Sequence, residues 1–432
     1  MSTILVCSTP LHGHVTPMLA AARVLQEHGH RVVVLTGTRF EPRVVAAGLE
    51  FAPLGSVADF DETDPSTFAP DRPLRGLALS RWQVERTFVE PVADQARAVQ
   101  TVLDATPVDG VLADCLFGGV LPLLARPRAS RPFVFGLGIG PLAQLSRDVA
   151  PSNSGLGPSS STFGRIRNVT MNALVTQVLF RSTQRLAQAK LAEVGAPALD
   201  GPVLDLSARF DRLLQLGPAE FEYPRSDLRP NTTFIGPFPP AASGRSGPGE
   251  TALPAWWTDL DPNRPLVHVT QGTLDNHDFT KLVRPALDGL AAEPVEVVVS
   301  TGGRPVSGLG PLPANAHAAE YLPYGQLLPR TAVMVTNGGY GGTLLALRHG
   351  VPLVVAGAAE DKPEVAARVA HFGVGVDLRT GRPSPSQVRD AVVRVLGDGA
   401  VADRARAMGE AIARTDAPRA LLEAVTSELA SV

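Results

Sequence analysis

The pattern that most limits the fold is a short apolar strand that ends in a polar loop and is followed by a helix. The β-branched run Thr3–Ser8 leads through the loop Thr9–Val15 into an amphipathic stretch, Thr16–His28, which Gly29 ends. Arg31–Leu35 then has the composition of a second buried strand. Strand, helix and strand in this order predict a parallel sheet with helices on its faces.

The same pattern recurs in both halves of the chain. Further strands are predicted where apolar runs end in a polar or glycine-containing loop: Val108–Ala113, Pro132–Leu137, Leu266–Thr270, Val295–Ser300, Val333–Thr336 and Pro352–Ala356. A helix is expected after Ser384, because Pro385 and Gln387 complete the pattern of a capped helix start. We therefore predict an α/β protein with two doubly wound, Rossmann-like domains that face each other across a cleft.

A segment rich in proline and glycine separates the two series, between Arg225 and Pro254. The length of 432 residues suits two or three domains. We predict an N-terminal domain over residues 1–236, a linker over 237–256 and a C-terminal domain over 257–410. The last residues, 411–432, are predicted to form a helix that packs back on the N-terminal domain.

Two further stretches of the N-terminal half have a distinct character. Gly138–Thr162 is rich in Gly, Ser and Pro and lacks a period, so we expect either a mobile binding loop or a poorly ordered one. Residues 165–195 are predicted to form one long amphipathic helix or two shorter ones.

Composition limits the partners. A net charge of −3 gives no indication of a nucleic-acid partner or an acidic membrane partner. Cys7 and Cys115 each lie in an apolar run that is predicted as a strand or strand end, and we expect reduced thiols rather than a disulfide or a metal site. The apolar start Ile4–Cys7 is too short for a signal peptide, and no apolar run is long enough for a membrane span, so a cytoplasmic protein is expected.

The strongest candidate site is the glycine-rich segment from Asn337 to Thr343, between the strand that ends at Thr336 and a helix-like stretch. A strand, a glycine turn and a helix start present free backbone N–H groups to an anion such as a diphosphate. An ordinary tight turn between strand and helix explains the same residues, because glycine-rich loops are weak motifs when they stand alone.

Context favours the diphosphate. Four elements stand in order: Tyr321-Leu322-Pro323, Asn337-Gly338-Gly339, Gly350-Val351-Pro352 and Asp361-Lys362-Pro363. With them the whole chain resembles the family 1 nucleotide-sugar glycosyltransferases, the two-domain enzymes of the GT-B architecture that include antibiotic and macrolide glycosyltransferases. The resemblance implies the following donor-binding residues: Thr273, Tyr321, Leu322, Asn337, Gly338, Gly339, Gly341, Gly342, Thr343, Asp361 and Lys362.

The chain departs from the family pattern at four of these places or beside them. Asn337 stands where a phosphate-contacting His is usual, and Tyr321 replaces a Trp or Phe that stacks on the base. Leu345 stands where many UDP-using relatives have a Glu for the ribose hydroxyls, which favours a dTDP-sugar. Lys362 replaces a Gln that, with Asp361, contacts the donor sugar; a solvated loop pair is the alternative for these two residues.

The loop after the first strand contains Gly13-His14-Val15-Thr16-Pro17, which is similar to the family's Gly-His-x-x-Pro. The resemblance implies that His14 is the catalytic base and that Asp114, after a later strand, orients it. Histidine suits this role because its ordinary pKa lies near neutrality. A structural histidine and a turn-forming aspartate are the alternatives. His12 is then expected to line the acceptor pocket.

The acceptor is expected to be a small lipophilic molecule, such as a secondary metabolite, contacted by the N-terminal domain. Candidate contacts are Trp82, Phe117 and Leu142, with Phe88 nearby, although aromatic and leucine side chains are more often core. No metal and no cofactor are implied, and Asp59 and Asp61 are interpreted as surface charge. A homodimer is compatible with the sequence.

The predicted activity is an inverting, metal-independent transfer from a dTDP- or UDP-sugar. Two other functions remain open at this point: a nucleotide-sugar epimerase on the same architecture, and a non-catalytic relative that binds nucleotide sugars, which Asn337 and Lys362 keep open.

Overall fold

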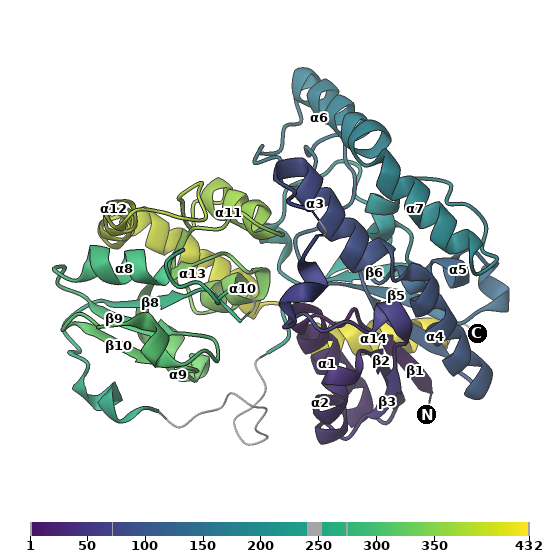
Figure 1. Ribbon diagram of the computed structural model, residues 1–432, viewed down its shortest axis with the longest axis horizontal. Coiled ribbons are helices and arrows are strands. Elements are labelled where there is room, and N and C mark those ends of the chain that lie inside the picture. Colours follow the sequence, from purple (N-terminus) through teal and green to yellow (C-terminus); the bar gives the residue numbers. More distant parts are fainter. Residues whose placement is uncertain (1, 71, 240–252, 274, 431–432) are drawn as a thin grey trace.

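The computed structural model describes residues 2–70, 72–239, 253–273 and 275–430, and these residues form two parallel β-sheets side by side (Figure 1). The first sheet has seven strands in the order β3-β2-β1-β4-β5-β6-β7, and the second has six in the order β10-β9-β8-β11-β12-β13. In each sheet the strand order reverses beside the first strand, as in doubly wound nucleotide-binding folds. The prediction of two Rossmann-like α/β domains is confirmed.

The strands of the first sheet are short and mostly buried, because helices cover both faces. Their bounds are β1 (Thr3–Cys7), β2 (Arg31–Thr36), β3 (Glu50–Pro53), β4 (Gly110–Asp114), β5 (Phe133–Gly138), β6 (Arg212–Gln215) and β7 (Thr232–Phe234). The α-helices before the second sheet are α1 (His12–Glu27), α2 (Glu41–Ala46), α3 (Gly76–Val84), α4 (Val92–Ala105), α5 (Leu121–Leu124), α6 (Thr162–Leu174) and α7 (Arg181–Ala192).

The second sheet repeats the design. Its strands are β8 (Leu266–Thr270), β9 (Glu296–Ser300), β10 (Ala316–Ala319), β11 (Thr331–Thr336), β12 (Leu353–Val355) and β13 (Gly375–Asp377). The remaining α-helices are α8 (Val283–Leu290), α9 (Tyr324–Leu327), α10 (Tyr340–Arg348), α11 (Lys362–His371), α12 (Pro385–Gly397), α13 (Gly399–Ala413) and α14 (Ala417–Leu429). The start of α12 is as predicted, because Ser384 and Gln387 form a reciprocal capping box.

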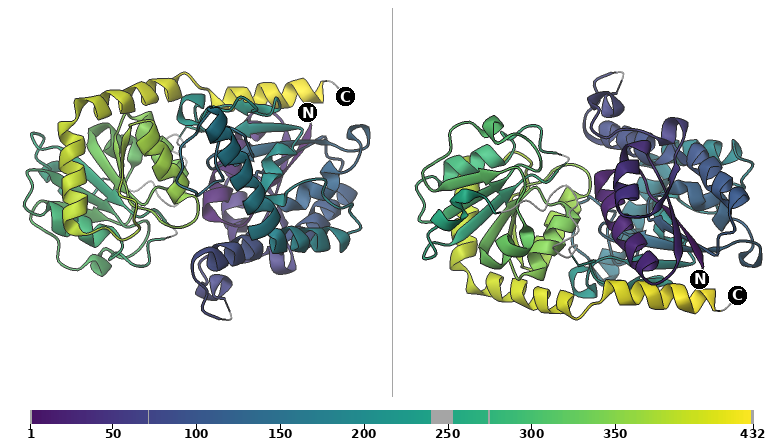
Figure 2. Two further views of the ribbon diagram at one scale, coloured as in Figure 1. Left: turned by 90° about the horizontal axis from the view of Figure 1, so that it is seen from above. Right: turned by 90° about the horizontal axis from the view of Figure 1, so that it is seen from below.

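The chain returns to the first sheet at its end. Figure 2 shows α13 against the second sheet and α14 running on along the first. Leu421 and Val425 of α14 are fully buried in the hydrophobic core that includes α1 and one face of the first sheet. Of the linker predicted over residues 237–256, the stretch 240–252 lies outside the described residues. Among the described residues, none of the helices combines the length and apolarity that crossing a membrane requires.

Helix α1 begins earlier than predicted. The carbonyl of Leu11 accepts the N–H groups of His14 and Val15 at 2.9 and 2.8 Å, so His12 and His14 lie in the first helical turn. The loop prediction was wrong here because glycine and proline are poor helix formers. Pro17 removes only the single bond that its missing N–H would have made to the Gly13 carbonyl.

The segment from 138 to 162 is irregular but held in place. Buried or partly buried carboxylates accept its backbone N–H groups: Leu142 donates to Glu222 at 3.0 Å, and Leu145 donates to Asp205 at 3.1 Å. The following helical stretch is two helices, α6 and α7, separated by a π-helical turn at Val175–Leu179.

Candidate active site

The carboxyl edges of the two sheets meet, which brings the predicted residues of both domains together. Asn153, in the segment after β5, donates its backbone N–H to Glu364 of α11 at 2.8 Å. Tyr340 of α10 donates its hydroxyl to the Leu216 carbonyl of the N-terminal domain at 2.8 Å. In doubly wound sheets this edge is where ligands bind.

His14 and Asp114 form a pair at the carboxyl edge of the first sheet. The register of β1 and β4, with Cys7 beside Ala113, brings Asp114, the last residue of β4, beside the residues that follow β1. His14 Nδ1 lies 3.3 Å from Asp114 Oδ1, slightly farther than in a well-formed hydrogen bond, and it has no hydrogen-bond partner among the described residues. Such catalytic contacts are often long before substrate binds.

Asp114 is fully buried and fixed by backbone groups. The N–H of Thr9 donates to its Oδ2 at 2.6 Å, and the N–H of Leu116 donates to its Oδ1 at 2.9 Å. Burial alone would raise the pKa of this carboxyl, but His14 and the two N–H donors outweigh it and lower the pKa below its usual range. The group is therefore an ionised carboxylate aimed at the histidine ring.

Phe88 lies beside this pair. Its ring stacks on His14 with a centroid distance of 5.7 Å and an interplanar angle of 24°. Phe88 belongs to a π-helical turn, Glu85–Val89, that follows α3. Turns of this kind are rare and often occur at functional sites. The stacking limits the orientation of the His14 ring, as Asp114 does from another side.

His12 is a base of a different character. The Arg43 guanidinium donates to its ring Nδ1 at 3.2 Å, and the backbone N–H of His12 donates to the Glu62 carboxylate at 2.8 Å. Burial, followed by the charges of Arg43 and Arg39, lowers the pKa of His12 to about 4. A histidine that remains neutral and accepts from an arginine is not poised to take a proton near neutral pH.

The glycines of the 337–343 segment fall into two groups. Gly338 has a φ of +88°, and a Cβ there would lie 2.6 Å from a methyl carbon of Val355, so the fold itself requires a glycine. A Cβ on Gly339, Gly341 or Gly342 would meet nothing within 4 Å. The latter two lie in the first turn of α10, whose N–H groups have no acceptor within the helix.

Asn337 joins this loop to the loop after β8. Its Nδ2 donates to the Gln271 carbonyl at 2.6 Å, and its side chain is largely buried. Thr273 is exposed at the end of that neighbouring loop. Thr343 is fully buried, and its hydroxyl has no hydrogen-bond partner among the described residues. The donor-binding roles of these residues stay predictions.

The side chains of Tyr321 and Leu322 differ in their exposure: the first lies at the surface and the second lies in a core. Tyr321 is 37% exposed and lies over Gly303, where a Cβ would come within 2.3 Å of its hydroxyl oxygen. Gly303 therefore provides the space that the Tyr321 ring occupies. Leu322 is buried in a small core with Leu266 and Val298, so its side chain is unavailable to a nucleotide and only its backbone remains a candidate contact.

Asp361 and Lys362 lie at the start of α11. Lys362 is 4% exposed and its ammonium forms a close ion pair with Glu360, which excludes the solvated loop pair considered above. Burial raises the pKa of Asp361 above its ordinary value, and the Lys362 charge opposes this only in part. Asp361 faces the N-terminal domain, because a Cβ on Gly140, which follows β5, would lie 3.7 Å from its Oδ2.

Arg368 is a further residue of this region that the sequence did not indicate. Its guanidinium donates to Glu222 of the N-terminal domain and to Glu364 of its own helix, both at 2.6 Å, and lies 4.2 Å from the centre of the Tyr223 ring. It thereby ties α11, which begins with Lys362, to the other domain. The spacing of Glu364 and Arg368 was the available signal, but it also describes an ordinary surface pair.

The acceptor candidates are only partly on the surface. Trp82 is half-buried on α3 and remains available. Phe117 and Leu142 are 0% and 2% exposed and belong to the hydrophobic core beneath the first sheet. Their side chains are therefore core residues, the alternative that their residue types already suggested.

Asp59 and Asp61 stabilise the loops around them. Asp59 accepts the Thr38 N–H at 2.9 Å, and Asp61 accepts from Thr63 and pairs with Arg39. Within the described ranges, no group of three or more His, Cys, Asp or Glu side chains is arranged to hold a metal ion.

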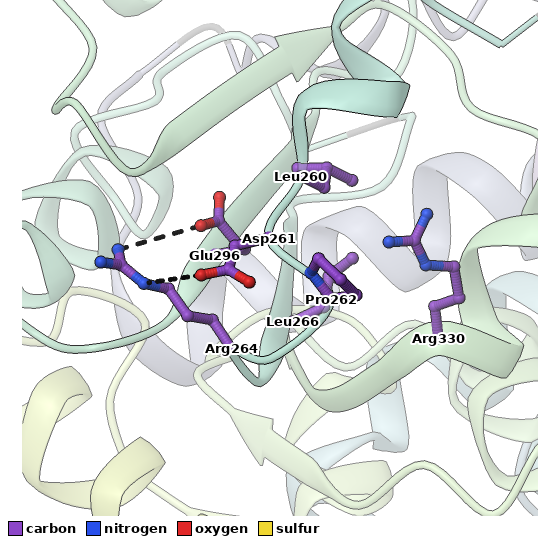
Figure 3. Close-up of a pocket in the computed structure, with 7 residues that line it drawn as sticks. All are labelled: Leu260, Asp261, Pro262, Arg264, Leu266, Glu296 and Arg330. Atoms are coloured by element: carbon purple, nitrogen blue, oxygen red, sulfur yellow. Dashed lines mark ion pairs between the residues drawn. The ribbon is translucent and has the colours of Figure 1, made fainter.

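A hollow of about 220 Å³ lies elsewhere, beside the amino ends of β8 and β9 (Figure 3). Arg264 extends there towards Asp261 and Glu296 at 3.5 and 3.9 Å. Because it faces the edge opposite to the predicted residues, this hollow has no part in the site described above.

Known proteins resemble the chain along its length. Residues 284–427 match the family described as the C-terminal domain of erythromycin biosynthesis protein CIII-like proteins. The 4'-demethylrebeccamycin synthase of Lentzea aerocolonigenes is 39% identical over 91% of this chain and 92% of its own. The UDP-glycosyltransferase 2 of Phaeomoniella chlamydospora is 34% identical over 99% of this chain and 96% of its own.

The solved structure of the kitacinnamycin glycotransferase has the same fold, with a TM-score of 0.76 at 23% identity and 99% coverage of both chains. Fold and site together define a two-domain glycosyltransferase of the GT-B type. The chain belongs to the family 1 nucleotide-sugar glycosyltransferases. The alternative functions, an epimerase or a non-catalytic binding protein, are therefore not favoured.

Proposed function

We propose that the protein transfers a sugar, with inversion, from a dTDP- or UDP-sugar to a hydroxyl group of a small lipophilic acceptor. The observation that carries the proposal is the His14–Asp114 pair at the carboxyl edge of the first sheet, the edge that Asp361 of the other domain also faces. Beside it, three glycines at the start of α10 have open space where a side chain would lie. A base, a bound diphosphate and a sugar between them are the parts that such a transfer needs.

His14 is the proposed general base. The Asp114 carboxylate beside Nδ1 favours the tautomer that carries its proton on Nδ1, and this leaves Nε2 free to take a proton. Nε2 takes the acceptor hydroxyl proton as the oxygen attacks the anomeric carbon. The bond from that carbon to the diphosphate oxygen breaks, and the nucleoside diphosphate leaves with the electron pair. Attack from the face opposite to the leaving group inverts the anomeric centre.

Backbone N–H groups are proposed to hold the leaving diphosphate. The first turn of α10 offers unpaired N–H groups at its positive end, and Gly341 and Gly342 leave the approach open. Asn337 uses one amide hydrogen for the Gln271 carbonyl, so it contributes at most its second to a phosphate. This arrangement stabilises the charge of the leaving group without requiring a metal.

The donor sugar is proposed to lie between His14 and Asp361. The Asp361 carboxylate accepts sugar hydroxyls, whereas the Lys362 ammonium is engaged by Glu360 and acts mainly to position the start of α11. Tyr321 is proposed to stack on the base. Thr273, the Leu322 backbone and Thr343 complete the proposed donor contacts.

The acceptor is proposed to enter over Phe88, whose half-buried ring stacks on His14, and to contact the half-buried Trp82 on the preceding helix α3. The name 4'-demethylrebeccamycin synthase indicates that this relative acts on a natural product. A natural product is therefore the proposed acceptor class here.

A thermal-shift series with UDP, dTDP and GDP tests the donor site. The melting temperature is expected to rise with dTDP or UDP, because only the folded state binds them. Leu345, which packs on the core of the second domain, favours dTDP, and the UDP-glycosyltransferase relative favours UDP. An unchanged melting temperature with all three nucleotides would contradict the proposed donor site.

A further inference from the structure

Helix α6 carries apolar side chains on its outer side. Large hydrophobic residues of α6 and of the π-helical turn after it are exposed: Phe163 (88%), Ile166 (61%), Val169 (53%), Leu174 (49%) and Val178 (62%). On a helix these positions fall within roughly half of the circumference. We call these five residues the α6 stripe. Figure 1 shows α6 at the outer end of the N-terminal domain.

The inner side of α6 is polar, which reverses the usual arrangement of a surface helix. Gly164, Asn168 and Asn172 are its buried residues. Asn168 donates to the Arg147 carbonyl at 3.1 Å, and Asn172 donates to the Ser146 carbonyl at 3.0 Å. Hydrogen bonds therefore hold the inner side of α6, and the five apolar side chains of its outer side remain about half to nine-tenths exposed in the described part of the chain. Continuous exposed apolar surface of this kind marks an interaction site.

Charge indicates what covers the stripe. From residue 162 to residue 192 the chain has no carboxylate and five cationic side chains, whereas the whole chain has a net charge of −3. These cations are Arg165, Arg167, Arg181, Arg185 and Lys190. Arg165 pairs with Asp148 and Lys190 with Glu193, but Arg181 and Arg185 are exposed and have no ion pair within the described part of the chain. The partner surface should therefore carry negative charge.

A second copy of the chain fits poorly. A symmetric dimer through the stripe would bring α6 and α7 against themselves. Arg167 lies in the same half of α6 as Phe163, so the two copies would bring like charges together with no carboxylate between residues 162 and 192 to pair with them.

We propose that the α6 stripe docks on an anionic phospholipid surface. The apolar side chains enter the boundary between headgroups and acyl chains, while Arg181 and Arg185 contact the phosphates. The contact is peripheral and reversible. It would place the N-terminal domain where lipophilic molecules concentrate, and it does not depend on the sugar-transfer proposal.

Vesicle co-sedimentation of the full chain tests this directly. The protein is mixed with vesicles of phosphatidylcholine alone or of equal parts phosphatidylcholine and phosphatidylglycerol. We expect binding to the anionic vesicles that weakens with salt and is much reduced on neutral ones. The double variant Phe163→Ser/Ile166→Ser is expected to bind roughly tenfold more weakly or worse, because both side chains lose apolar burial. Arg181→Gln/Arg185→Gln should remove the preference for anionic lipid.

Two matched controls keep the test specific. Val45→Ser on α2 and Val393→Ser on α12 alter exposed valines outside the stripe, at 59% and 48%, and these variants should bind as the wild type does. Circular dichroism checks that the stripe variants fold. The proposal is overturned if the wild type does not co-sediment, or if the stripe variants co-sediment like the controls. It is also overturned if sedimentation velocity shows a dimer that the double variant dissociates, since the stripe is then an interface between copies.

Discussion

Two junctions between a strand and a helix face each other in this protein, and they are built in opposite ways. At the first, β1 leads to α1, and the helix start carries His12 and His14. At the second, β11 leads to α10, and the start is a run of glycines. Both junctions lie at the carboxyl edge of a parallel sheet. The same position in the fold therefore presents histidine side chains in one domain and backbone N–H groups in the other.

This difference predicts that the two junctions respond in opposite ways to the removal and the addition of side chains. At the α1 junction the histidine is held by a buried carboxylate and a stacked phenylalanine, so removing a side chain should be costly there. At the α10 junction the first-turn glycines leave open space, so adding a side chain should be costly to a ligand without harming the fold. The predictions below test these two expectations in turn.

Replacing the base should have the largest effect. His14→Ala is expected to lower kcat by about 10³-fold or more, because the variant loses the proposed general base. Nucleotide affinity, measured by calorimetry, should be unchanged because the proposed diphosphate contacts lie in the other domain. His28→Ala, at the exposed far end of the same helix, is the control and should keep wild-type turnover. A His14→Ala variant with near-normal kcat would remove His14 from the mechanism.

Altering the partner of the base should cost less. Asp114→Asn is expected to lower kcat by roughly 10²-fold or more with little change in KM for the donor, because the histidine loses its orienting anion. Some stability is lost too, since the new amide faces an N–H donor of Thr9 or Leu116.

Asp109 offers a matched control for that variant. It stands at the other end of the same strand, where its carboxylate accepts the Thr3 N–H at 2.7 Å. Asp109→Asn should leave kcat unchanged while removing a similar backbone contact. Equal kcat values for the two variants would mean that Asp114 is only structural.

Two alanine substitutions separate the functions of the α10 glycines. Gly341→Ala should raise the free energy of unfolding by about 0.5–1 kcal/mol, because alanine favours the helix, and should weaken nucleotide binding by about tenfold. Gly338→Ala should instead destabilise the fold, since its φ is positive and Val355 occupies the space. Urea unfolding and nucleotide titration distinguish the two. If Gly341→Ala binds nucleotide as well as the wild type, the open space there does not serve a ligand.

The sequence predicted the parts of the fold that are strongly patterned. The eight predicted strands all exist, because each is a continuous apolar run that two covered faces demand. The strands that it missed are short, with three or four residues: β3, β6, β7, β10 and β13. Most of them lie at or near the sheet edges, where burial is weaker and the apolar pattern is correspondingly faint.

The site was predictable where it follows from strand ends and not where it depends on long-range packing. His14 and Asp114 each follow a predicted strand, and adjacent parallel strands bring such residues together. Arg43 contacts His12, and Arg368 contacts Glu222, between elements that lie far apart in the chain. The spacing of residues within one element does not predict such contacts. The reversed polarity of α6 is of the same kind, because periodicity shows that a helix has two faces but not which one is buried.

The smallest expected effect tests the contrast between the two histidines of α1. The pKa of His12 is about 4 in the folded chain and near 6.5 when unfolded, so the unfolded chain takes up a proton more readily as the pH falls between these values. Protonation of this group therefore lowers stability as the pH falls from about 6.5 towards 4. His12→Gln removes that contribution, since glutamine does not titrate and its oxygen can still accept from Arg43.

Urea unfolding at neutral pH and at about pH 5 measures the effect. The variant should lose roughly 1 kcal/mol less than the wild type between the two conditions. The variant should still lose some stability between the two pH values, because buried His268, whose pKa is also about 4, titrates in the same range. The pH profile of kcat should follow the wild type, because the neutral His12 takes no proton in the reaction. A displaced acid limb in that profile would transfer the base from His14 to His12 and reverse the assignment at this junction.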